Sequence, residues 1–141
     1  MTISFTGTRH GMSKLQYAAV VKLLGELKPS MVVHGDCIGA DTDFHNICIK
    51  IRGSYTNPGP PLIKIRPSNA KTRANNEGYD LIMPSRDPLD RDRDIVNDCE
   101  KLIACPLRSE EELRSGTWAT VRYARIQKKI IYIINPDGSL R

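Results

Sequence analysis

The amino-acid sequence predicts an α/β fold: a Rossmann-like, doubly wound parallel sheet of about five strands, in one domain spanning residues 1–141. Three observations support this prediction. Short apolar runs alternate along the chain with segments whose apolar residues recur at helical spacing. The runs are apolar throughout, which is typical of parallel strands covered on both faces. Finally, 141 residues with 40% hydrophobic and 26% charged side chains suit one globular core.

The first half of the chain predicts two strand–helix units. The first unit pairs a strand at 2–6 with a helix that begins after Ser13, a residue type that caps helices, and stops at Pro29. The second pairs a strand at 31–33 with a helix that ends near Gly53. Each helix carries an apolar stripe, so both are expected to pack on the sheet.

The second half continues the alternation after a loop at 54–61. A third strand is predicted at 62–65, and the weak pattern from 67 to 86 indicates a polar loop or a short helix. Beyond it we expect a helix from Asp87 to about Cys99, a strand at 102–105, a helix from Gly116 to about Gln127 and a strand at 130–134.

Right-handed crossovers between parallel strands limit how these strands can be arranged. Counted along the chain, they are expected in the order 3-2-1-4-5. The winding then changes direction between the first and fourth strands. Ligands of such sheets bind beyond the carboxyl ends of the strands at this switch point, so the functional site is predicted there.

Three loops that leave carboxyl ends of strands combine glycine with polar residues. Glycine lets the backbone approach a phosphate, and the helix after each loop offers free N–H groups at the positive end of its dipole. The spacing matches neither the Walker A loop nor the G-x-G-x-x-G motif, and short loops also need glycine for geometry alone. The ligand-binding candidates in these loops are Gly7, Thr8, Arg9, Gly35, Asp36, Gly39, Asp41, Ser115, Gly116 and Thr117.

Several residues suit a structural role as well as a functional one. Asp36 and Asp41 suit hydrogen bonds to ribose hydroxyls, but Asp41 also suits the cap of the second helix. Arg9 and His10 either contact an anionic ligand or are simply exposed loop residues. Trp118 has a face on which a base could stack, but its place in the second turn of a helix favours the core.

Three stretches carry a resemblance to a known superfamily. They are His34-Gly35-Asp36-Cys37-x-Gly39-Ala40-Asp41, Arg91-x-Arg93-x-Ile95-Val96 and Arg114-Ser115-Gly116-Thr117-Trp118-x-Thr120-x-Arg122-Tyr123-Ala124-Arg125. With them the sequence resembles the SLOG superfamily, Rossmann-like proteins related to DNA-processing Smf proteins and to the LOG ("lonely guy") phosphoribohydrolases. The resemblance covers most of the chain except 67–86. It implies a nucleotide-type ligand held against the last glycine loop, and a homodimer.

The sequence departs from the LOG pattern at one catalytic position. LOG enzymes carry P-G-G-x-G-T-x-x-E in the last loop; Gly116 and Thr117 match the G-T, but Thr120 stands where the glutamate is expected. These enzymes also use an arginine early in the preceding helix, which Arg91 or Arg93 matches. Residues two apart point about 200° apart on a helix. Only one arginine can therefore face the ligand, and the other should be solvated or paired with an aspartate such as Asp90 or Asp94.

Three functions follow as hypotheses. The first is a sensor or binding module for a nucleotide or a nucleotide-derived small molecule. The second is a hydrolase of a nucleotide N-glycosidic or phosphate bond, with His34, Asp36 or Asp41 as acid or base. The third is single-stranded DNA binding, as in Smf proteins; it needs stacking aromatics, and these make up only 6% of the chain.

Composition limits the remaining possibilities. The net charge of +5 favours anionic partners without selecting one. No apolar run approaches the roughly 20 residues that span a bilayer, and the N-terminus lacks a signal-peptide pattern, so a cytoplasmic protein is expected. His34-x-x-Cys37 and His45-x-x-Cys48 together offer four possible zinc ligands, but Cys48 falls on an apolar stripe and is expected to face the sheet. No metal site and no cofactor are expected.

Overall fold

The computed structural model of the chain describes residues 1–52 and 61–141. Within these residues, six strands form one sheet in which every neighbouring pair is parallel, in the order β4-β3-β2-β1-β5-β6. The elements are β1 (Thr2–Gly7), α1 (Lys14–Leu27), β2 (Met31–His34), α2 (Ala40–Arg52), β3 (Leu62–Ile65), β4 (Leu81–Ile82), α3 (Pro88–Asn97), β5 (Lys101–Cys105), α4 (Gly116–Ile126) and β6 (Ile130–Ile133).

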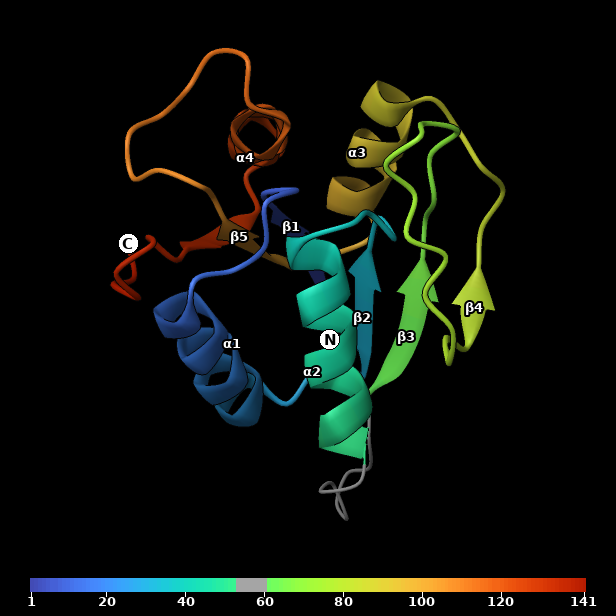
Figure 1. Cartoon of the computed structure of the whole chain (residues 1–141), viewed down its shortest axis with the longest axis horizontal. Helices are drawn as coiled ribbons and strands as arrows, with labels where there is room; N and C mark the ends of the chain where they lie inside the picture. Colours follow the sequence, from blue (N-terminus) through green and yellow to red (C-terminus); the bar gives the residue numbers. More distant parts are fainter. Residues whose placement is uncertain (53–60) are drawn as a thin grey trace.

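The doubly wound α/β architecture is confirmed. In Figure 1, α1 and α2 lie on one side of the sheet, and α3 and α4 lie on the other. On the first side, Phe5 of β1 stacks on Phe44 of α2 with ring centroids 4.4 Å apart. On the second side, Trp118 of α4 packs against Ala104 of β5 and is 1% exposed, so the tryptophan belongs to the core.

The predicted strand order is correct for the five predicted strands, but their number is one short. The prediction of a polar loop or short helix at 67–86 is corrected at 81–82, where β4 adds an edge strand beside β3. Leu81 and Ile82 are 45% and 44% exposed, and the backbone N–H of Asp80 and Met83 donates to carbonyls of β3. A two-residue, half-exposed strand held by its backbone leaves no hydropathy pattern to detect.

The caps of the helices determine where the site-bearing loops end. At α1, the Ser13 side chain accepts from the Gln16 backbone N–H at 3.0 Å, and the Gln16 side chain accepts from the Ser13 N–H at 2.9 Å. The two side chains form a capping box, which confirms the helix start predicted after Ser13. The predicted helix end at Gly53 and most of the loop at 54–61 lie outside the described residues. None of the described helices is both long and apolar enough to cross a membrane.

Candidate functional site

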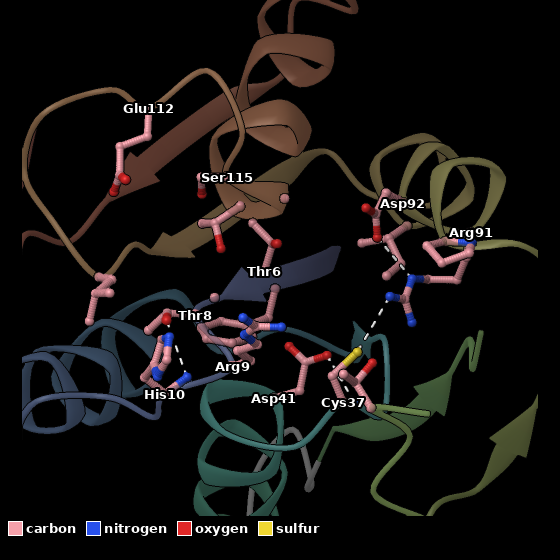
Figure 2. Close-up of a pocket in the computed structure, with 18 of the residues that line it drawn as sticks. Thr6, Thr8, Arg9, His10, Cys37, Asp41, Arg91, Asp92, Glu112 and Ser115 are labelled. Atoms are coloured by element: carbon pink, nitrogen blue, oxygen red, sulfur yellow. Dashed lines mark hydrogen bonds and ion pairs between the residues drawn. The ribbon is translucent and has the colours of Figure 1, made fainter. Parts of the chain in front are cut away.

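A cavity of about 540 Å³ opens at the carboxyl ends of β1 and β5, which are the strands at the predicted switch point. Its walls come from the loops after β1, β2 and β5 and from the amino-terminal halves of α3 and α4 (Figure 2). The predicted residues that line it are Gly7, Thr8, Arg9, Asp41, Arg91, Ser115, Gly116 and Thr117. Five other candidates, His34, Gly35, Asp36, Gly39 and Arg93, lie outside its lining.

The glycines of the loops serve two different purposes. A Cβ on Gly7 would lie 2.6 Å from the Ala40 Cβ, and one on Gly35 would lie 2.6 Å from Arg91 Nη1. Gly39 has a φ of +88°, and a Cβ there would overlap the Arg9 carbonyl. These three glycines are therefore needed for close packing. By contrast, a Cβ on Gly116 would meet nothing within 4 Å, so only this glycine keeps open space at the cavity.

The amino terminus of α4 presents hydrogen-bond donors to the cavity. The Ser115 Oγ accepts from the Trp118 backbone N–H at 3.2 Å and so caps the helix. Among the described residues, no acceptor is bonded to the backbone N–H of Gly116 or Thr117. Free N–H groups at the positive end of a helix dipole favour an anion.

Asp41, the second residue of α2, is the candidate acid or base that reaches the cavity. Its Oδ2 accepts from the backbone N–H of Gly35 and of Cys37, each at 3.2 Å. The side chain thus holds the loop after β2 and does not cap its own helix. It is 6% exposed, and burial raises its pKa to about 7. Figure 2 shows one carboxyl oxygen turned toward Cys37 and the other away from it.

Asp36, in the loop after β2, binds the segment at residues 73–76 and does not line the cavity. Its backbone has a φ of +53° and its side chain is fully buried. Oδ1 accepts from the backbone N–H and from Nδ2 of Asn76, both at 2.9 Å, and Oδ2 lies 3.4 Å from Arg73 Nε. Asp36 therefore anchors residues 73–76, and its carboxylate is taken up by that task.

His34 belongs to a buried hydrogen-bonded chain. Its Nε2 lies 2.9 Å from His45 Nδ1, and His45 Nε2 lies 2.6 Å from the Glu77 carbonyl. Because a carbonyl can only accept, His45 Nε2 donates to it, and His34 Nε2 then donates to His45 Nδ1. Burial lowers the pKa of His34 to about 3, so its ring fits this chain as a neutral donor. In residues 1–52 and 61–141, no group of three or more His, Cys, Asp or Glu side chains could hold a metal ion.

The two arginines of α3 point to different places, as the helical spacing predicts. Arg91 lines the cavity, where Nη1 donates to the carbonyls of Gly35 at 2.6 Å and Arg66 at 3.2 Å, and Nε donates to Asp92 Oδ1 at 2.8 Å. Arg93 is exposed and lies over the Tyr123 ring, 5.5 Å from its centroid. Asp90 and Asp94, its suggested partners, pair instead with Arg86.

Sequence reasoning missed several lining residues. Asp92 stands between the two candidate arginines on α3, and the helical spacing used for them makes no prediction for the direction of this aspartate. Thr72 comes from the weak segment at 67–86, where the Ile38 backbone N–H donates to its carbonyl at 2.8 Å. No pattern in the sequence signals that contact. The lining residues outside the prediction are Phe5, Thr6, Cys37, Thr72, Pro88, Asp92, Ile95, Leu107, Glu112 and Arg114, whereas His10, a candidate together with Arg9, also lines the cavity.

Comparison with known proteins adds no assignment to this geometry. No family model, curated protein or solved structure matches the chain. The function must therefore be argued from the cavity itself.

Proposed function

We propose that the chain binds a nucleotide or a nucleotide-derived small molecule in the cavity between β1 and β5, as a sensor or binding module. The observation that carries this proposal is the amino terminus of α4, where Gly116 leaves unbonded backbone N–H groups open to the cavity. This is the arrangement that binds phosphate in many α/β proteins. A cavity of about 540 Å³ also falls within the usual size of small-molecule sites.

The charges along the cavity suit a ligand with both an anionic and a hydroxyl-bearing part. Arg9 and Arg114 supply positive charge, and Asp41 and Asp92 supply acceptors for hydroxyl or amino groups. A sugar phosphate offers both kinds of partner in one molecule. A cytoplasmic location and the homodimer implied by the SLOG resemblance are further parts of this proposal.

Isothermal titration tests the proposal directly. Nucleoside mono-, di- and triphosphates, titrated separately into the folded protein, should include at least one that binds with micromolar affinity or better. Ribose 5-phosphate and the free bases, titrated in parallel, show which part of the ligand supplies the binding energy. A folded protein that binds no member of this panel would reject the nucleotide site.

A second candidate function is hydrolysis of the bound nucleotide, and one observation favours it. Of the three proposed acid–base residues, His34 and Asp36 are engaged elsewhere, but Asp41 lines the cavity with a pKa of about 7. A carboxyl with a pKa near neutrality suits proton transfer at physiological pH. Formation of free base or phosphate from nucleoside monophosphates would test it.

A further inference from the structure

The loop between β5 and α4 forms one wall of the cavity, and its backbone is held weakly. Of residues 107–114, all except Glu112 are exposed. Within the part of the chain that the structure describes, their one backbone–backbone hydrogen bond runs from the Ser115 N–H to the Glu112 carbonyl, at 3.4 Å. In Figure 1 the loop stands out from the sheet as a wide arc. A segment with exposed side chains and few backbone hydrogen bonds opens easily.

Both ends of this loop are fixed, which confines any movement to its middle. At the first end, the carbonyl of Pro106 accepts from Nε2 of the buried Gln16 at 2.9 Å. At the second end, the Ser115 side chain caps α4. Between the two ends, Glu112 and Arg114 line the cavity. The loop is therefore hinged at two points beside the proposed ligand.

Arginine side chains attach the middle of the loop to α4. Arg122 donates from Nη2 to the Leu113 carbonyl at 3.1 Å and from Nη1 to the Glu112 carbonyl at 3.3 Å. The Glu111 carboxylate pairs with Arg125 at 2.7 Å and with Arg122 at 3.5 Å. The side chains of these two ion pairs are between 32% and 48% exposed. Ion pairs at such exposure contribute little and are screened by salt, so this attachment can be released while the protein stays folded.

A further attachment comes from the carboxyl-terminal segment. Arg141 donates from Nη2 to the Ser109 carbonyl, and its guanidinium lies over the Trp118 ring, 5.3 Å from the centroid. This contact too is made by a side chain and not by the backbone. The position of the loop thus depends on surface side chains alone between its two fixed ends.

Leu113, at 86% exposed, is the most exposed large apolar side chain among the described residues. It stands between Glu112 and Arg114, whose side chains line the cavity. A single exposed leucine is ordinary on a protein surface. This one, however, lies at the rim of a cavity and on a loop that is free to move. Movement of the loop toward the cavity would bury it against a ligand, which is favourable for an apolar side chain.

We propose that residues 107–114 form a lid over the cavity, that the Glu111 ion pairs latch this lid in its open position, and that Leu113 covers the ligand when the lid closes. The inference rests on the proposed nucleotide site, and it assigns Leu113 to the flat, apolar face of the base. Because the latch favours the open lid and the ligand favours the closed one, the two oppose each other. A fixed wall would behave differently, since loosening it would weaken binding.

Trypsin digestion of the protein without ligand tests the latch. Cleavage after Arg114 is followed by mass spectrometry. Glu111→Gln should be cleaved about two- to fivefold faster than the wild type, the range expected for loss of exposed ion pairs, and Arg122→Gln, which also loses both carbonyl bonds, faster still. Glu110→Gln is the matched control: it removes a neighbouring exposed carboxylate without an ion pair in the described residues, and should be cleaved as the wild type is. In about 1 M NaCl the difference between Glu111→Gln and the wild type should shrink.

Calorimetry with AMP, ADP and ATP tests the closure. Glu111→Gln should lower the Kd by about two- to fivefold, because the ligand no longer has to break the latch. Leu113→Ser should raise the Kd at least about tenfold, the effect of losing a buried leucine. Ile126→Ser, at a position 72% exposed near the end of α4 and outside the cavity, is the matched control and should keep the wild-type Kd. Thermal unfolding of each variant shows whether it folds.

The two measurements fail separately. Equal cleavage of the wild type and of folded Glu111→Gln overturns the latch, whether or not a nucleotide binds. Equal Kd values for the wild type and Leu113→Ser overturn the closure and leave the nucleotide site intact, and a higher Kd for Glu111→Gln identifies a fixed wall in place of a lid. If none of the three nucleotides binds, the proposed site and the closure over it both fail, while the trypsin rates still decide on the latch.

Discussion

Replacement of Asp41 by asparagine should change how the stability of the protein depends on pH. Burial raises the pKa of this carboxyl from 3.8 to about 7, so between these pH values the folded chain binds a proton that the unfolded chain releases. Stability must therefore fall as the pH rises through this range. A pKa difference of about three corresponds to roughly 4 kcal/mol in total, or about 1.4 kcal/mol for each pH unit. Asparagine keeps a carbonyl oxygen for the two backbone N–H groups but does not titrate.

Urea unfolding at several pH values between about 4.5 and 6.5 provides the assay. The quantity to plot is the free energy of unfolding of the wild type minus that of Asp41→Asn, because all other titrating groups are common to both proteins and cancel. This difference should fall by about 1.4 kcal/mol per pH unit. Glu26→Gln, which removes an exposed carboxyl from α1, should show no comparable fall. A difference that stays constant or grows with pH for Asp41→Asn would refute the buried, protonated carboxyl.

Four further experiments test other parts of the structure. Gly116→Val should abolish nucleotide binding without loss of fold, whereas Gly25→Val, at an equally open helical position, should bind as the wild type does; equal affinities in calorimetry would move the ligand away from α4. Arg91→Ala should weaken nucleotide binding at least about tenfold, and it should lower the Tm because it also removes the hydrogen bonds to two backbone carbonyls. Arg93→Ala, at an exposed position, should change the Kd less than about threefold. Because burial lowers the pKa of His34 from 6.5 to about 3, the stability that its neutral form contributes is lost as the pH falls through this range. The free energy of unfolding of the wild type should fall by about 1.4 kcal/mol per pH unit relative to that of His34→Gln. The same pH dependence in urea unfolding of both proteins would contradict this. Light scattering should show a dimer at micromolar concentration, and a monomer would reject that part of the proposal.

The sequence predicted more of the fold than of the candidate site. Periodicity located five strands because each contributes buried apolar residues, and the handedness of the crossovers predicted their order correctly. It missed β4, whose two residues pair through the backbone and stay half-exposed. The winding of the sheet also predicted which edge carries the cavity, because the switch point follows from the strand order alone.

Side-chain direction explains most of what the sequence left open at the site. Asp36 lies in the loop after β2 and Asp41 lies five residues further on, at the start of α2, yet only Asp41 lines the cavity. The reason is tertiary: Asp36 meets Asn76 from a segment without a recognisable pattern. The sequence contained no sign of Asp92 for the same kind of reason, because nothing in its neighbourhood along the chain shows that its side chain pairs with Arg91 and lines the cavity.

The hydrogen bonds of Arg91 also limit what its presence in a related sequence can indicate about ligand binding. This side chain joins α3 to the loop after β2 and to the carbonyl of Arg66, whether or not a ligand is present. Selection for a stable fold would therefore preserve this arginine even in related proteins that no longer bind the ligand. Gly116 is under no such packing constraint, since a side chain there meets nothing. If the proposed site binds its ligand at α4, loss of Gly116 in a related sequence would indicate that binding has been lost, whereas retention of Arg91 would not indicate that binding has been kept.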